Sequence, residues 1–118
     1  MPRRRPEAKV SRPPSLHREF VRRFPRLGQA WDLVNEEGAA GSLDVRTQRL
    51  VKLAIAVGAM REGAVHAGVR KARDAGATSE EMEQVVALAA STIGFPACVA
   101  AWSWVRDETR RRGRPRRR

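Results

Sequence analysis

Apolar side chains recur at intervals of three and four residues along most of the chain, and this spacing predicts helices. The first such stretch begins at Ser15, and its apolar positions are Leu16, Phe20, Phe24, Leu27, Trp31 and Val34. Pro25 has no backbone N–H and divides this stretch into two helices or one kinked helix. Gly38, Gly41 and Ser42 end it.

Two more helices are expected in the middle of the chain. Asp44 is a typical N-cap residue for the first of them. The apolar face of that helix consists of Leu50, Leu53, Ala54, Val57 and Met60. The second covers about Glu62 to Ala75, and Gly76 provides its C-terminal stop.

The remaining chain predicts two final helices. Thr78 and Glu81 have the spacing of a capping box, which marks a helix start. The apolar positions after it are Met82, Val85, Val86, Ala89 and Ile93. After Gly94-Phe95-Pro96 a last helix runs to about Arg110, with Val99, Trp102 and Val105 on one face. No segment has the alternation of a strand, so the fold class is all-α.

These patterns predict one helical domain over residues 15–109, with a tail on each side of it. Residues 1–14 are basic, rich in proline and without apolar periodicity, and residues 110–118 are rich in arginine. We expect both tails to be disordered. The core is rich in alanine, which favours thin helices in close contact and the burial of further surface against a second subunit.

The net charge of +11 is concentrated in the tails. Residues 1–12 carry +4 and residues 106–118 carry +6, whereas residues 13–105 carry only +1. The folded body is therefore nearly neutral. The charge of the tails is informative about binding partners more than about the fold.

Neither a membrane span nor a disulfide is expected. Residues Gln84 to Val105 carry no charge, but Gly94-Phe95-Pro96 interrupts them, so we predict two buried helix halves and not a membrane span. Cys98 is the single cysteine, which excludes an intramolecular disulfide or a cysteine-based metal site. We predict a cytoplasmic protein with no metal and no cofactor.

The order of three segments resembles the carboxymuconolactone decarboxylase family, which includes AhpD-like proteins. The segments are Leu43–Ala54, then Val69–Ala72 with Ala75–Glu81, then Ile93–Ala97 with the alanine-rich helix after it. The resemblance implies a compact antiparallel bundle of about five to six helices, assembled as a homo-oligomer such as a trimer or hexamer. It also implies either thiol peroxidase chemistry or acid–base chemistry on a small organic substrate.

The reactive residues of the family's thiol branch are absent here. When the motif is aligned by counting back from Gly76, its two cysteines fall on Arg61 and Ala64 and its histidine on Gly68. Its upstream glutamate falls on Arg49. Cys98 lies in an apolar run, where a thiol behaves as a small hydrophobic group. Peroxidase activity by the family mechanism is therefore not expected.

Small side chains form a stripe where the motif would project: Ala64, Gly68, Ala72 and Ala75. One interpretation is close packing of two helices. The other is a cavity for a small ligand, lined by Ala64, Val65, Gly68 and Val69 and covered by Trp102.

Glu62 and His66 are the candidate catalytic residues. They are four positions apart and share a helix face, on which they could form a proton-transfer pair. His66 lies nearly opposite the small-residue stripe, so it does not simply replace the missing histidine. The alternative is an exposed or interface histidine.

The C-terminal tail is a candidate polyanion site. Arg112-Gly113-Arg114-Pro115 resembles the core of an AT-hook, in which arginines enter the DNA minor groove. Arg112, Arg114 and Arg116 are the predicted contacts, unless the tail serves only solubility.

Two functions follow as hypotheses, and the sequence leaves open whether the protein is an enzyme. The first is acid–base chemistry on a small organic substrate. The second is a non-catalytic oligomeric scaffold whose arginine tails bind nucleic acid or another polyanion.

Overall fold

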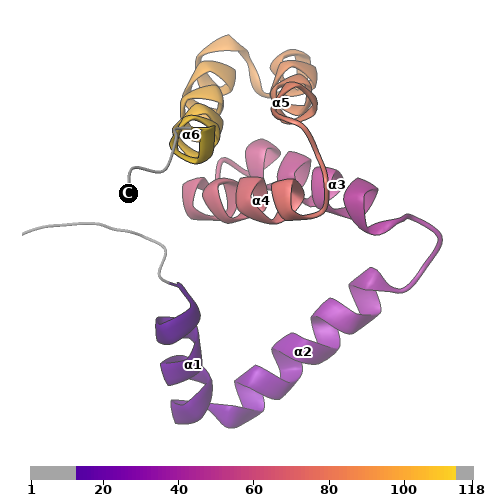
Figure 1. Cartoon of the computed structure of the whole chain (residues 1–118), viewed down its shortest axis with the longest axis vertical. Helices are drawn as coiled ribbons and strands as arrows, with labels where there is room; N and C mark the ends of the chain where they lie inside the picture. Colours follow the sequence, from indigo (N-terminus) through magenta and orange to yellow (C-terminus); the bar gives the residue numbers. More distant parts are fainter. Residues whose placement is uncertain (1–12, 114–118) are drawn as a thin grey trace, which may run out of the picture. The chain divides into compact units, whose positions relative to one another are not determined.

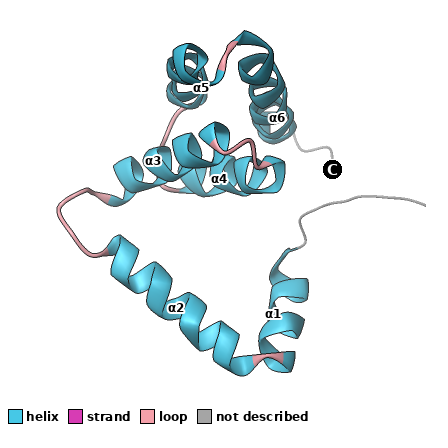
Figure 2. Ribbon diagram, turned by 180° about the vertical axis from the view of Figure 1, so that it is seen from behind, coloured by secondary structure: helices cyan, strands magenta, loops and turns pink. Residues whose placement is uncertain are grey.

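A computed structural model describes residues 13–113 and folds them into six α-helices, with no strand among them (Figures 1 and 2). The helices are α1 (Pro13–Arg23), α2 (Pro25–Ala39), α3 (Val45–Gly58), α4 (Glu62–Asp74), α5 (Ser79–Ile93) and α6 (Phe95–Gly113). The predicted all-α class and the number of helices are confirmed.

The ends of the helical region extend slightly beyond the predicted domain. Helix α1 begins at Pro13, two residues before the predicted start of the domain at Ser15. Helix α6 continues through residues 110–113 of the predicted tail, because arginine is a good helix former and nothing breaks the helix before Gly113. The rest of both predicted tails lies outside the described residues.

The helix boundaries follow from the capping residues seen in the sequence. The Asp44 carboxylate accepts a hydrogen bond of 2.8 Å from the Thr47 backbone N–H and caps α3. At α5, the Glu81 N–H donates to the Thr78 hydroxyl, and the Thr78 N–H donates back to the Glu81 carboxylate. Gly76, which follows α4, has a φ of +97°, a conformation that glycine adopts at little cost.

Contacts divide the chain into two compact units, with the division between Ser42 and Leu43. The first unit contains α1 and α2, which pack against each other after a break at Phe24. They approach closely at Gly28, where an added Cβ would lie 2.6 Å from Val21 Cγ1. Gly28 is the only buried residue of this unit among those described.

The large apolar side chains of the first unit are exposed. Each keeps 40–68% of its surface accessible within the single chain. They are Leu16, Phe20, Phe24, Leu27, Trp31, Leu33 and Val34. The helical spacing of this stretch was therefore predicted correctly, but it does not produce a core within the unit.

The second unit contains α3 to α6 and holds the hydrophobic core. Helix α3 packs against α4 and α5, and α6 packs against the same two helices (Figure 1). The buried core residues are Leu53, Ala56, Val57, Val65, Val69, Ala72, Ala77, Met82, Val86, Ala101 and Val105. Most of them are alanine or valine, and small side chains allow the helices to lie close together.

The buried face of α6 differs from the predicted one. Val105 is buried as expected, but Val99 and Trp102 remain 47% and 38% exposed. The face that packs inward carries Ala101, Val105 and Glu108, at intervals of four and three residues. A small alanine lets α6 approach α4, whereas the bulky Trp102 stays at the edge, where the Arg106 guanidinium lies 4.5 Å from its ring centre.

No helix among residues 13–113 is both long and apolar enough to cross a membrane.

Candidate functional site

A buried carboxylate joins α6 to α4. Glu108 is only 4% exposed and is the one polar residue among the buried side chains of the described chain. An ionised side chain in such a position is unfavourable unless charged or hydrogen-bonding partners surround it. Glu108 has such partners, and they all come from α4.

His66 is the nearest of these partners. Its Nδ1 lies 2.9 Å from Glu108 Oε2, and its Nε2 lies 3.3 Å from Glu62 Oε2. The imidazole is 20% exposed, between a buried carboxylate and a largely exposed one. Since a carboxylate only accepts hydrogen bonds, we infer that Nδ1 donates to the buried Glu108, and that Nε2 donates to the more accessible Glu62 when the ring carries both protons.

Two arginines complete the surroundings of Glu108. Arg70 Nη1 lies 3.4 Å from Glu108 Oε2, so that oxygen is shared between an imidazole and a guanidinium. Arg73 Nη2 donates to the backbone carbonyl of Glu108 at 3.3 Å. His66, Arg70 and Arg73 lie three to seven positions apart on α4, which places them on the side of the helix that faces α6.

This arrangement brings together the predicted pair and a residue that sequence reasoning missed. Glu62 and His66 are in contact, as the spacing of four residues predicted. From the sequence alone, Glu108 is only one of the charges of residues 106–118. Its spacing from Ala101 and Val105 was the available signal, since three residues at this interval share a helix face.

The small-residue stripe of α4 faces several environments. An added Cβ at Gly68 would lie 3.3 Å from Leu53 Cδ1 and 3.6 Å from Leu53 Cα, so α4 packs closely on α3 there. Ala72 is fully buried, whereas Ala64 is exposed. This geometry favours the packing interpretation at Gly68 and Ala72.

The residues predicted to line a cavity line neither the hollow between α3 and α5 nor the one between α3 and α4. Val65 and Val69 are fully buried in the core, and Trp102 packs with Arg106 at the surface. One hollow lies between α3 and α5 and is lined by Ala54, Gly58, Val85, Leu88, Ala89, Thr92 and Ile93. The other lies between α3 and α4 and includes Arg49 and Lys71. A ligand cavity at the stripe stays a prediction.

The positions of the thiol motif carry no thiol. Arg61 is the N-cap residue of α4, and Ala64 and Gly68 lie on the same helix. Cys98 is on α6, where its Sγ lies 3.2 Å from the Val86 carbonyl oxygen. Among residues 13–113, no group of three histidine, cysteine, aspartate or glutamate side chains is placed to hold a metal ion.

The predicted polyanion contacts fall at or beyond the end of α6. Arg112 belongs to its last turn, with a side chain outside the described part of the structure. Arg114 and Arg116 lie wholly outside the described residues.

Comparison with known proteins places the chain in a family. The model of the carboxymuconolactone decarboxylase family matches residues 25–107. The fold is similar to the crystal structure of a carboxymuconolactone decarboxylase family protein from Legionella pneumophila, with a TM-score of 0.72 and 21% identity over 81% of this chain and 87% of that one. No curated protein matches the sequence. Since the family model spans well over half of the sequence, the chain belongs to the carboxymuconolactone decarboxylase family.

Proposed function

We propose that this protein catalyses proton transfer on a small organic substrate, with His66 as the group that accepts and donates the proton. The observation that carries the proposal is the placement of His66 between the buried Glu108 and the exposed Glu62. An imidazole is well suited to proton transfer because one ring nitrogen can accept a proton while the other donates one.

The two carboxylates have different roles in this proposal. Glu108 is a positioning residue: it accepts a hydrogen bond from Nδ1 and so fixes the ring orientation and the tautomer. Glu62 is 58% exposed, so a substrate can displace it from Nε2 without removing it from a packed interior. Arg70 balances the charge of Glu108 when the imidazole is neutral.

Thiol peroxidase activity is not part of the proposal. A thiol mechanism needs a reactive thiolate and, to recycle it, a resolving thiol. The single Cys98 contacts a backbone carbonyl and lies on α6, away from the positions where the family's thiol branch carries its cysteines.

We propose further that the protein works as a homo-oligomer, such as a trimer or hexamer. The exposed apolar side chains of α1 and α2 support this, since monomeric proteins rarely expose apolar surface of this extent. Light scattering coupled to size-exclusion chromatography measures the number of subunits. A monomer over the full accessible concentration range would contradict this part of the proposal.

The proton-transfer proposal can be tested without knowledge of the natural substrate. The protein is incubated in D₂O with a panel of small lactones and β-keto acids, and NMR follows deuterium incorporation and loss of CO₂. We expect His66→Gln to lower the rate for an accepted compound by at least roughly a hundredfold, the usual contribution of a general acid–base group.

His17→Gln is the matched control, since His17 is the only other histidine and is exposed on α1. Glu108→Gln should change the pH dependence of kcat/KM, which separates a positioning role from a purely structural one. A His66→Gln protein that is folded and keeps the wild-type rate would exclude His66 from the reaction.

A further inference from the structure

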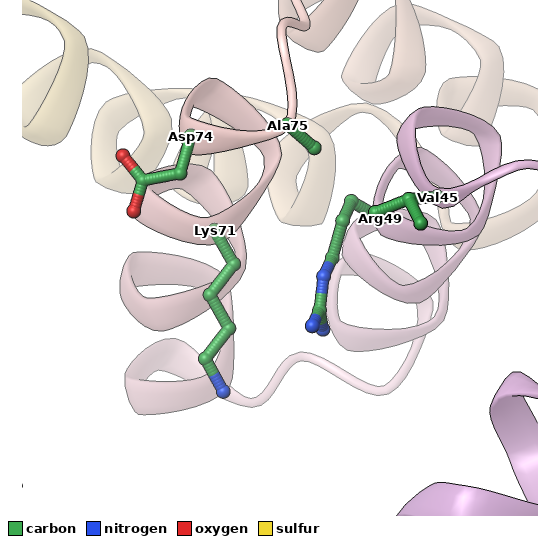
Figure 3. A pocket seen from close by; sticks show the side chains of 5 residues that line it. All are labelled: Val45, Arg49, Lys71, Asp74 and Ala75. Atoms are coloured by element: carbon green, nitrogen blue, oxygen red, sulfur yellow. The ribbon is translucent and has the colours of Figure 1, made fainter.

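A hollow of about 270 Å³ lies between the start of α3 and the end of α4. Val45, Arg49, Lys71, Asp74 and Ala75 line it (Figure 3). The Arg49 and Lys71 side chains extend in the same direction on either side of the space between the two helices, whereas the Asp74 carboxylate points away from Arg49 (Figure 3). The hollow therefore presents two cationic groups and a short apolar wall.

The charges of these two groups are not balanced by nearby acids. None of the ion pairs among residues 13–113 involves Arg49 or Lys71. Partial burial lowers the pKa of Lys71, and the positive charges of Arg49, Lys52 and Arg70 lower it further. Lys71 is thus repelled by three other cations, of which only Arg70 is paired with an acid of the described chain, Glu108. Asp74 is the acid of the lining, and an added anion beside Arg49 and Lys71 would relieve this repulsion.

The hollow and the His66 cluster lie on different sides of α4. Lys71 follows His66 by five residues, which is a rotation of about 140° around the helix. His66 contacts Glu108 of α6, whereas the lining of the hollow comes from α3 and α4. Binding in the hollow therefore does not depend on the proposed proton transfer.

We propose that this hollow binds a small oxyanion, a carboxylate or a phosphate, between the Arg49 guanidinium and the Lys71 ammonium. A guanidinium offers paired N–H donors that match two oxygens of such a group, and an ammonium adds a compact charge. The volume suits a molecule of a few carbon atoms, and the side chains of Val45 and Ala75 provide apolar contact for its carbon part.

The test follows the lysine side chains of the full-length protein by NMR. The chain has only Lys9, Lys52 and Lys71, so isotope-labelled lysine gives three side-chain NMR signals. Succinate and inorganic phosphate are titrated separately at constant ionic strength. We expect a saturable shift of the Lys71 signal and a rise of the Lys71 pKa with at least one of the two anions, while Lys9 does not saturate.

The two anions distinguish the sources of the oxyanion: saturation by succinate alone indicates a carboxylate ligand, and saturation by phosphate alone indicates a phosphate ligand. Arg49→Gln should weaken binding at least tenfold, and Arg49→Lys should weaken it less because the charge remains. Arg61→Gln is the matched control, since Arg61 lies at the other end of α4, about 15 Å from Lys71 along the axis.

Two results would overturn the proposal. One is a Lys71 signal that follows ionic strength and saturates with neither anion. The other is equal affinity of the wild type and a folded Arg49→Gln protein, with folding checked by circular dichroism.

Discussion

The two units of this chain differ in whether they bury a hydrophobic core. In the α3–α6 unit, small apolar side chains form a core that is almost completely buried. In the α1–α2 unit, larger apolar side chains occur at the same helical spacing but stay exposed. Periodicity thus gives a helix its apolar face in both units. Only the α3–α6 unit buries a core with its own helices, although Ile55, Leu88 and Phe95 stay 64–74% exposed there too.

This difference indicates how each unit is stabilised. Isolated helices of 11 and 15 residues are marginal in water, and most helical stability in proteins comes from packing of an apolar face. The α3–α6 unit supplies this packing itself, whereas the large apolar side chains of the α1–α2 unit stay exposed.

A matched pair of leucine substitutions tests this difference between the two units most directly. Leu53 is fully buried on α3, and Leu27 is 53% exposed on α2. Leu53→Ala should lower the free energy of unfolding by about 2–5 kcal/mol because it leaves a cavity. Leu27→Ala should lower it by less than about 1 kcal/mol in the monomer. Urea denaturation at low protein concentration measures both, and equal effects would mean that Leu27 is buried in an assembly.

A pair of glycine substitutions compares the close helix contacts of the two units. An added methyl at Gly28 would lie 2.6 Å from Val21 Cγ1, so the Val21 side chain or the two helices must shift. Gly28→Ala should therefore destabilise their packing by about 1–3 kcal/mol. At Gly68 the nearest atom is at 3.3 Å, and the gain in helix propensity, about 1 kcal/mol, should offset most of the strain.

Hydrogen exchange resolved by segment tests both glycine changes. Faster exchange confined to α1 and α2 is expected for Gly28→Ala. Unchanged exchange there would show that the two helices do not depend on this contact.

The capping box of α5 should give a smaller effect. Thr78→Ala removes the hydroxyl that accepts from the Glu81 N–H, and should lower the free energy of unfolding by about 1 kcal/mol. Ser79→Ala is the control, since Ser79 is exposed and follows the cap. Thermal unfolding compares the two variants, and equal melting temperatures would contradict the assigned cap.

The smallest effect is expected from the pH dependence of the α3 cap. Hydrogen bonds from Thr47 lower the pKa of Asp44 below its usual 3.8. The stabilisation from the ionised carboxylate is therefore present above pH 3.8 and lost as the pH falls through the folded-state pKa. Asp44→Asn should show a weaker loss of stability in acid than the wild type. Asp32→Asn on α2 serves as the control, and an identical change there would remove the assignment to Asp44.

The helices, and the absence of cysteine at the family's motif positions, follow from the sequence alone. Asp44, the Thr78–Glu81 box and Gly76 act within one turn of their own position, so their roles do not depend on the rest of the fold. The same local character made the contact between Glu62 and His66 predictable from their spacing. The identity of residues 61, 64 and 68 was sufficient to argue against a family thiol mechanism.

Which helix faces are buried and which distant side chains come into contact depend on the tertiary structure. Glu108 lies 42 positions from His66, and Arg49 lies 22 positions from Lys71, so neither pairing could be read from local spacing. The rotation of α6 depends on the fit of Ala101 and Val105 against the neighbouring helices, and this rotation buries Glu108 and leaves Trp102 at the edge. Local propensities set each helix, but packing against other helices sets its rotation, and that rotation forms both candidate sites.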